Sequence, residues 1–142
     1  MSSAAERNER TVRGLFADVV ESQQYDRVAE YCDPEVVMHR PGDVVVEGRD
    51  AYAEHYRTLH DALPDLSASL TDLVADGDRV GTRFVVTATH EGAILGLAPT
   101  GREVRFAAQV LFRLADGAVT EEFHQSDLDH LREQLRGDRP TG

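Results

Sequence analysis

The sequence predicts an α+β fold in which N-terminal helices pack on one face of a curved antiparallel β-sheet. Up to residue 63, apolar residues recur at three- and four-residue steps, which is the period of a helix. Beyond Pro64, apolar and polar residues alternate between tight-turn signals, which indicates half-buried strands. Helices followed by hairpin-linked strands are typical of α+β proteins. We expect this arrangement to enclose a pocket that suits a small apolar ligand.

Apolar residues at helical spacing predict three helices in the first half of the chain. A first helix is expected over residues 5–22 and a shorter one over 25–32. Asp33-Pro34 ends the second, because the residue before a proline avoids the helical conformation. A third helix, over 49–63, carries its apolar and aromatic residues along one face. A short strand over 36–38 and an extended segment over 44–48 are expected between them.

Four longer strands are expected after Pro64. Asp76-Gly77-Asp78 and Asp116-Gly117 have the turn chemistry that joins antiparallel strands into hairpins. A Gly/Pro-rich loop is expected over 92–101, and a short helix closes the chain over 129–135. The strands are expected over 66–70, 79–90, 102–114 and 119–126.

Length and composition are typical of one globular domain. The chain has 142 residues, of which 41% are hydrophobic and 29% charged, enough to bury a core. We expect a single domain over 1–142, with its core at about 5–136 and a flexible tail over 137–142. No basic segment followed by an apolar stretch opens the chain, and Cys32 is its single cysteine. Both observations point to the cytoplasm.

The charge balance is strongly acidic. Asp and Glu total 26 against 15 basic residues, all of them Arg, so the net charge is −11. Such a surface argues against nucleic acid and anionic membrane as partners. Acidic surfaces with Arg in place of Lys resemble proteins of salt-loving microbes, a halophile being our preferred source, or of organisms with GC-rich genomes. An ordinary acidic protein is the alternative.

Six short landmarks occur in an order and spacing that resemble one family. None of them is specific by itself, and together they cover nearly the whole chain. The sequence is similar to the SnoaL-like polyketide cyclase family, within the nuclear transport factor 2-like superfold. The landmarks are His39-Arg40-Pro41-Gly42, Gly48-Arg49, Pro64-Asp65-Leu66, Gly77-Asp78-Arg79-Val80, Thr89-His90-Glu91-Gly92 with Pro99-Thr100-Gly101, and Glu121-Glu122-Phe123 with Asp127.

The resemblance implies acid/base catalysis without a metal or a cofactor. In the family's cyclases an Asp at the end of the last strand is the acid/base of an intramolecular aldol closure, and the matching residue here is Asp127. On strand parity Asp127 shares a face with Glu121, Phe123 and Gln125, and burial of that face would raise its pKa. Alternatively, Asp127 caps the closing helix. His39 is the second catalytic candidate, with a half-exposed histidine at a strand end as the alternative.

Several other side chains are expected to line the substrate pocket. Gln109 lies among apolar residues and would need a partner such as a ligand carbonyl if it were buried. His90 is expected either at the pocket mouth or in a structural role beside the 92–101 loop. Tyr52 and Tyr56 would bring hydroxyl groups to the cavity or simply pack in the core. The full set is Gln109, His90, Tyr56, Tyr52, Phe16, Phe123 and Phe84. No histidines stand at metal-ligand spacing, so no metal site is expected.

The sequence thus favours a small enzyme that transfers protons on a hydrophobic carbonyl compound, in the manner of a polyketide or ester cyclase. One alternative is a non-catalytic protein that binds a small hydrophobic molecule in the same cavity. Another is an epoxide-hydrolase-like hydrolase, which needs a carboxylate pair with an intervening Arg. We also expect a homodimer packed sheet to sheet through an apolar face that includes Leu70, Val85, Leu111 and Phe112.

Overall fold

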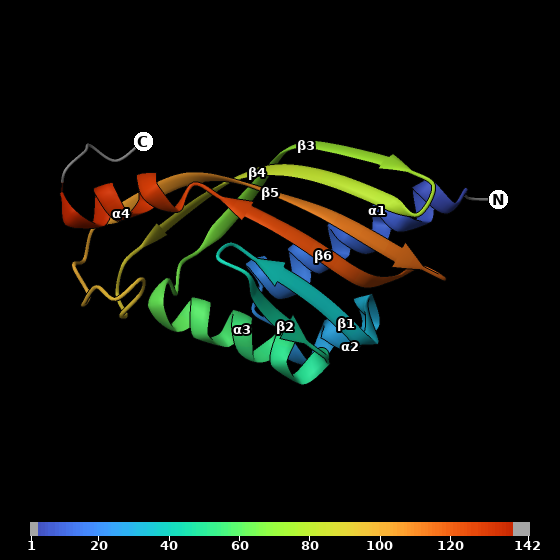
Figure 1. The fold of residues 1–142 in the computed structure, drawn as a ribbon, viewed down its shortest axis with the longest axis horizontal. Coiled ribbons are helices and arrows are strands. Elements are labelled where there is room, and N and C mark those ends of the chain that lie inside the picture. The colour runs from blue at the N-terminus through green and yellow to red at the C-terminus, as the bar shows by residue number, and fades with distance from the viewer. Residues whose placement is uncertain (1–2, 138–142) are drawn as a thin grey trace.

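The computed structural model describes residues 3–137 and confirms the α+β prediction (Figure 1). The described strands form one six-stranded sheet in the order β2-β1-β6-β5-β4-β3. Neighbouring strands are antiparallel except β1 and β6, which run parallel. Most of the expected flexible tail, residues 138–142, lies outside the described residues. The strands are β1 Cys32–Arg40, β2 Val44–Glu47, β3 Ser67–Asp76, β4 Arg79–Thr89, β5 Glu103–Ala115 and β6 Ala118–Ser126.

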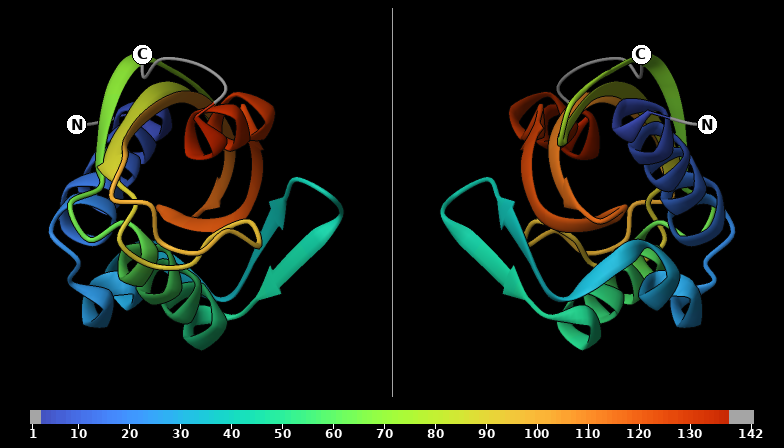
Figure 2. Two further views of the ribbon diagram at one scale, coloured as in Figure 1. Left: turned by 90° about the vertical axis from the view of Figure 1, so that its left-hand side faces the viewer. Right: turned by 90° about the vertical axis from the view of Figure 1, so that its right-hand side faces the viewer.

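The helices cover the concave side and one end of the sheet. Figure 2 shows strands β3 to β6 curving around a central space, which α1 and α3 close from two sides. The hairpin of β1 and β2 projects away from that curve. The helices are α1 Ala4–Leu15, a π-helix at Phe16–Glu21, a 3₁₀ turn at Tyr25–Arg27, α2 Val28–Tyr31, α3 Arg49–Ala62 and α4 Leu128–Arg136.

The first predicted helix changes type partway along its length. Ser3 caps α1 by accepting a hydrogen bond from the backbone N–H of Glu6. After Leu15 the chain continues as a π-helix, in which the Ser22 N–H donates to the Ala17 carbonyl five residues earlier. Such wide turns are rare and are frequent at functional sites. Two side chains of this segment, Phe16 and Val20, contribute to the cavity described below.

The second predicted helix ends earlier than expected. Helix α2 stops at Tyr31, and Cys32, placed in the helix by the sequence analysis, begins β1. Pro34 therefore lies inside a strand. The pairing of β1 with β6 shifts register between Cys32 and Val37, and this irregularity accommodates a residue that has no N–H to donate.

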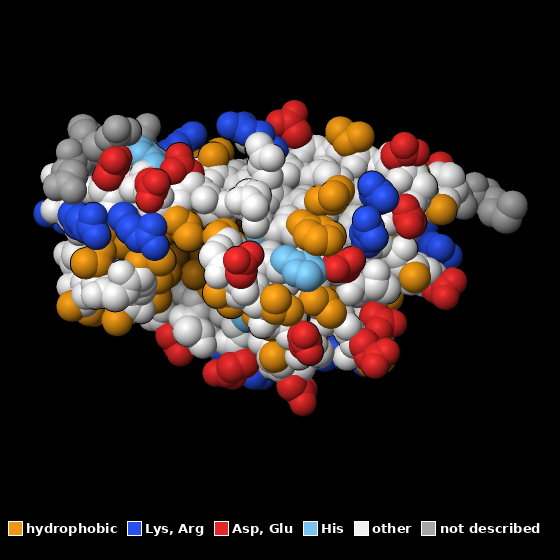
Figure 3. Space-filling model, viewed as in Figure 1, with side chains coloured by type: hydrophobic (Ala, Val, Ile, Leu, Met, Phe, Trp, Pro, Cys, Tyr) orange, Lys and Arg blue, Asp and Glu red, His pale blue; other side chains and the backbone are white. Residues whose placement is uncertain are grey.

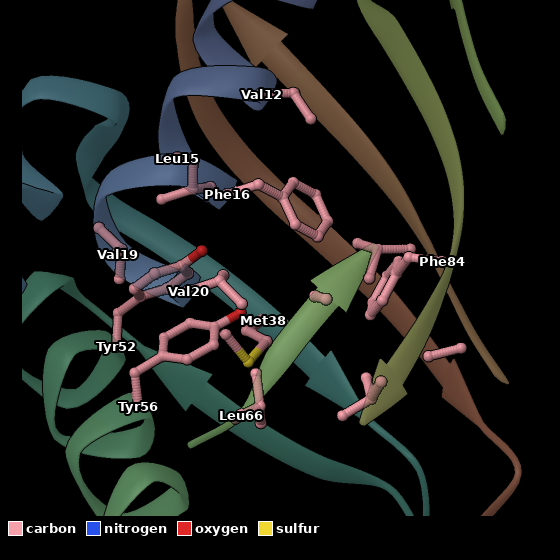
Figure 4. Close-up of a cluster of buried hydrophobic side chains, with 14 of the residues drawn as sticks. Val12, Leu15, Phe16, Val19, Val20, Met38, Tyr52, Tyr56, Leu66 and Phe84 are labelled. Carbon is pink, nitrogen blue, oxygen red and sulfur yellow. The ribbon is translucent and has the colours of Figure 1, made fainter. Parts of the chain in front are cut away.

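The core lies between the helices and the concave face of the sheet. Figure 4 shows Val12, Leu15 and Val19 pointing from the first helical segment toward the space between α3 and the sheet. Strand β5 alternates strictly, with its even-numbered side chains buried from Val104 to Leu114. Burial of this apolar surface stabilises the fold and fixes which strand face lines the interior.

No helix within residues 3–137 has the length and apolar character needed to cross a membrane.

Candidate active site

A cavity of about 260 Å³ lies between the concave sheet face and the helices. Its wall is mostly apolar, and Figure 3 shows apolar side chains around a recess near α4. Aromatic rings from the π-helix, α3, β4 and β5 contribute to the wall. Apolar cavities with a few convergent polar groups are typical small-molecule sites. The principal apolar lining is Phe16, Val20, Tyr56, Leu59, Leu63, Phe84, Val86, Ile94, Leu95, Phe106, Val110, Phe112, Leu128 and Leu131.

One part of the wall is polar, and it is built on a chain of hydrogen bonds. His124 of β6 and Arg40 of β1 both line the cavity. The Nε2 atom of His124 lies 2.6 Å from Oε1 of Glu122, and Nη1 of Arg40 lies 3.2 Å from Nδ1 of His124. Glu122 is fully buried behind His124, where its Oε2 accepts a 2.5 Å hydrogen bond from the hydroxyl of Tyr52. Three strand residues and one helix residue therefore form a single connected network.

The partners in this network specify their protonation states. Arginine only donates, so Nδ1 of His124 accepts from Arg40 and the imidazole proton is on Nε2, facing the Glu122 carboxylate. Burial first, and then the charge of Glu122, raises the pKa of Tyr52 well above its usual value, which keeps its hydroxyl a donor. Burial lowers the pKa of Arg40. Glu122 thus acts as an acceptor held by two hydrogen-bond donors.

Helix α3 contributes two further titratable side chains, His55 and Tyr56. Burial is the main cause that lowers the pKa of His55 to about 3, with Arg40 and His124 adding to the effect, so the imidazole is neutral at physiological pH. Its Nε2 atom is buried without a hydrogen-bond partner in the described residues. Burial also raises the pKa of Tyr56, so this hydroxyl stays protonated as well. Two neutral groups with hydrogen-bonding capacity therefore stand on the wall beside Arg40.

Strand β6 presents to the cavity the face opposite to the one that carries Phe123 and Gln125, although the family resemblance implied that Asp127, of the same parity, faces the pocket. Past the Asp116-Gly117 turn, Leu114 pairs with Val119, but Arg113 pairs with Glu121. This register shift is a β-bulge, and one extra residue in a strand moves every later side chain to the other face. The bulge therefore turns Glu122 and His124 inward and Phe123 outward.

Asp127, Gln109 and Phe123 consequently do not line the cavity. Asp127 is exposed and caps α4, with Oδ1 accepting from the His130 N–H at 3.1 Å. The capping alternative therefore describes its position, and the expectation of a pocket-facing Asp127 is wrong. Gln109 is exposed because it belongs to the outward set of β5, whose inward neighbours Ala108 and Val110 line the cavity instead. Phe123 lies on the outer face, 37% exposed.

His39 and His90 also lie away from the cavity wall. His39 is on the outer sheet face, where its ring stacks on Phe123 at 4.6 Å and its Nε2 lies 2.7 Å from Glu121. His90 is fully buried at the base of the 92–101 loop, and its Nδ1 accepts from the Thr100 N–H at 3.2 Å. The structural alternative thus describes His90, which anchors the loop.

Of the remaining expected pocket residues, three line the cavity and one stands behind it. Phe16, Tyr56 and Phe84 are on the wall, and the rings of Phe16 and Phe84 meet edge to face at 5.1 Å (Figure 4). Tyr52 is fully buried and reaches Glu122 rather than the cavity. Four residues of the site were not predicted from the sequence, namely Arg40, Glu122, His124 and His55. The alternation of β5 could have indicated the inward face of the sheet, but the bulge that aligns β6 with it leaves no clear sequence signal.

Comparisons with known proteins cover almost the whole chain. A family model described as SnoaL-like polyketide cyclase matches residues 10–135. A search of curated proteins finds no match. A candidate SnoaL-like polyketide cyclase from Jannaschia sp. CCS1 superposes with a TM-score of 0.89 at 26% identity, covering 99% of this chain and 98% of that one.

Two Streptomyces structures are similar to the same extent. IdmH from Streptomyces antibioticus, a candidate polyketide cyclase, has a TM-score of 0.80 and 27% identity over 91% of this chain and 98% of its own. AclR from Streptomyces galilaeus, a candidate hydroxylase, has a TM-score of 0.81 and 28% identity over 99% of this chain and 86% of its own. Similar folds thus carry different reaction assignments, so the chemistry has to be argued from the site.

Proposed function

Since the chain belongs to the SnoaL-like polyketide cyclase family, with the nuclear transport factor 2-like fold that the sequence predicted, we propose that it is a cyclase- or isomerase-type enzyme. It transfers a proton on a small hydrophobic carbonyl compound that is polyketide- or ester-like. The observation that carries this proposal is the position of His124, on the wall of an apolar cavity between a buried carboxylate and an arginine. A histidine oriented by a carboxylate is a common general base.

The three strand residues of the network have separate roles in the proposed reaction. Nδ1 of His124 removes a proton from the carbon next to the substrate carbonyl, and the C–H electron pair moves onto the carbonyl oxygen as an enolate. Glu122 holds the imidazole by its Nε2–H and stabilises the imidazolium that forms. The positive charge of Arg40 favours the enolate oxygen.

The enolate carbon then attacks a second carbonyl carbon of the same molecule. A C–C bond forms, and the electron pair of that second carbonyl moves onto its oxygen. The resulting alkoxide takes the proton from the His124 imidazolium, which restores the neutral base. In an isomerisation, the same proton returns to a different carbon of the enolate instead.

This proposal replaces Asp127 and His39 as the acid/base residues. Asp127 caps α4 at the surface, and His39 stacks on Phe123 on the outer face. A general base must come within hydrogen-bonding reach of the proton that it takes. A ligand inside the cavity is within reach of His124, which lines it, and the two outer residues do not line it.

The two alternative functions find less support in this geometry. A hydrolase of the epoxide type needs a carboxylate pair, yet the described cavity lining contains no Asp or Glu, and Glu122 lies behind His124. A purely binding protein would need no oriented base. Burying Glu122 without a function costs free energy that an apolar residue of similar size would avoid.

Deuterium exchange into 1-acetonaphthone, an aromatic methyl ketone, tests the proposal. In D₂O the protein should catalyse exchange of the methyl protons for deuterium, and proton NMR measures the rate of this exchange. His124→Gln should lower the rate roughly 100-fold or more, the usual effect of removing a general base. His39→Gln is the matched control and should keep the rate. An exchange rate no faster than that of buffer, or one unchanged in His124→Gln, would contradict the proposal.

The homodimer and the cytoplasmic location stay proposals. Leu111 and Phe123 are 38% and 37% exposed on the outer face of adjacent strands, which supports contact with a second copy there. Phe112, which the sequence analysis placed on that face, is buried and lines the cavity instead. Light scattering on the protein and on Leu111→Glu tests the dimer. We expect twice the mass of one chain, and one chain mass for the variant.

A further inference from the structure

The nitrogen that the proposed reaction needs is engaged by Arg40. Nδ1 of His124 accepts a hydrogen bond from Nη1 of Arg40 at 3.2 Å, while Nε2 is engaged with Glu122 at 2.6 Å. A guanidinium group has donors only. A proton on Nδ1 would therefore face another donor, and His124 cannot take one while this contact stands. Arg40 has to move off His124 before the imidazole can act as a base.

A further hydrogen-bond acceptor would stabilise the guanidinium group of Arg40. It lines the cavity, and its hydrogen bond to His124 uses one of its five N–H groups. None of the ion pairs within residues 3–137 includes Arg40. Burial of a cation whose direct partner is a neutral imidazole is costly. An oxygen atom of a bound molecule would be a stronger acceptor in this low-dielectric setting.

We propose that Arg40 is a positioning residue that keeps His124 inactive until a ligand oxygen takes its place on the guanidinium group. The effective ligand is a hydrophobic molecule with a carbonyl-type acceptor oxygen next to an acidic C–H bond. When this oxygen accepts from Arg40, Nδ1 is released beside the same C–H bond. The inference rests on the proposed function for the role of His124. The exchange of partners itself is a binding event and can be measured without turnover.

Among the groups around His124, Arg40 is the hydrogen-bond donor that a ligand oxygen can displace from the imidazole. On β6, Glu122 holds the opposite ring nitrogen and is itself fixed by Tyr52 of α3. On α3, His55 is neutral above about pH 3, and Tyr56 stays protonated because burial raises its pKa. Arg40 comes from β1, near the end of that strand, and meets the ring at Nδ1. Ligand oxygen and imidazole therefore compete for one guanidinium group.

This competition gives a selectivity that cavity shape alone does not provide. A hydrocarbon of the right size fills the apolar part of the cavity but offers Arg40 no acceptor, so His124 stays covered. A ketone of the same size removes Arg40 from the ring. The two ligands should thus differ in how readily His124 takes up a proton, although they contact the same apolar wall.

The test compares 1-acetonaphthone with 1-ethylnaphthalene, which has the same ring system without the oxygen. Protein labelled with ¹⁵N-histidine is titrated with acid in each complex, and the imidazole nitrogen shifts report protonation of Nδ1 of His124. We expect the ketone complex to take up the proton at a pH about one unit higher than the hydrocarbon complex does. Equal midpoints in the two complexes would overturn the inference.

Substitution of Arg40 separates this effect from simple loss of charge. Removing a cation changes the midpoint in every state, but the difference between the two ligands should disappear in Arg40→Met and Arg40→Gln. Arg57→Met, which removes an exposed charge on α3 outside the cavity lining, should keep the difference. A ligand difference that survives in both Arg40 variants would contradict the inference. Failure of the exchange assay with an intact ligand difference would count against the catalytic role alone.

Discussion

The sheet carries two carboxylate–histidine pairs, one on its inner side within β6 and one on its outer side between β1 and β6. On the inner side, Glu122 and His124 are 2.6 Å apart, with side chains 0% and 7% exposed. On the outer side, Glu121 and His39 are 2.7 Å apart, with side chains 31% and 36% exposed. The bond lengths are nearly the same, whereas the surroundings differ. Exposed pairs are screened by water and contribute little, whereas a buried pair couples strongly to anything that enters its cavity.

The two pairs should differ most in their contribution to the catalytic rate. Glu122→Gln removes the charge that stabilises the His124 imidazolium and should lower the exchange rate of 1-acetonaphthone by roughly 100-fold. Glu121→Gln makes the same chemical change one residue away. It should keep the rate within about twofold of that of the unsubstituted protein, because Glu121 lies outside the cavity in a more exposed position. Rates for the two purified variants under identical conditions decide the comparison. Similar losses in both would show that burial is not what distinguishes the pairs.

The next largest difference between the two pairs should be in their contribution to the free energy of unfolding. Glu122→Ala leaves His124 and Tyr52 without their shared acceptor and should lower the free energy of unfolding by about 3–6 kcal/mol, because two buried hydrogen bonds to a charged group are lost. Glu121→Ala removes an exposed pair and should cost less than about 1 kcal/mol. Urea unfolding of both variants provides the measurement. A smaller loss for Glu122→Ala than for Glu121→Ala would contradict this ranking.

The response of the protein to acid should depend on His55, which α3 places on the cavity wall. Burial lowers the pKa of His55 to about 3 in the folded protein from 6.5 for an unperturbed histidine. Between these values the unfolded chain binds more protons, so stability is full above pH 6.5 and falls as the pH decreases toward 3. His55→Gln should reduce this acid sensitivity, by a few kcal/mol at most. Unfolding free energies at pH 4 and pH 7 test this. Identical slopes in His55→Gln and in the unsubstituted protein would refute it.

The smallest expected difference concerns a single hydroxyl group. Tyr52→Phe removes the 2.5 Å donor to Glu122 and should cost about 1.5–3 kcal/mol, the usual effect for a hydrogen bond to a charged group. Tyr56→Phe, one helical turn later, removes a hydroxyl that does not contact the Glu122 carboxylate and should cost less. Thermal unfolding of both variants compares them directly. Equal losses would mean that the Tyr52–Glu122 bond adds little.

Regular periodicity was enough to predict the fold, but not to predict the site. The helical spacing of residues 5–22 and the alternation of β5 follow from burial of one face, and both were visible in the sequence. The position of β6 depends on one bulge near Thr120, between the Leu114–Val119 and Arg113–Glu121 pairs. Without that bulge, Phe123 and the residues of the same parity would lie on the inner face, where the family resemblance had placed Asp127. Local strand preferences scarcely specify such a shift.

The residues of the hydrogen-bonded network could not be predicted from the sequence for a related reason. Arg40 and Glu122 were part of motifs that the sequence analysis quoted, but nothing in the order of residues brings β1 next to β6. Their parallel pairing joins segments about 80 residues apart, and it places Arg40 beside His124. A charged residue at a strand end is more often exposed than buried, so residue type alone predicts a surface position for Arg40. Only the tertiary arrangement shows that these two side chains meet inside a cavity.

A crystal structure of the protein with 1-acetonaphthone bound would test the central claim most directly. We predict the naphthalene ring between the phenyl rings of the cavity, the carbonyl oxygen within hydrogen-bonding distance of Arg40, and the methyl carbon next to Nδ1 of His124. A ligand on the outer face beside Phe123 would contradict the account. A ligand in the cavity with Arg40 still bonded to His124 would contradict it equally.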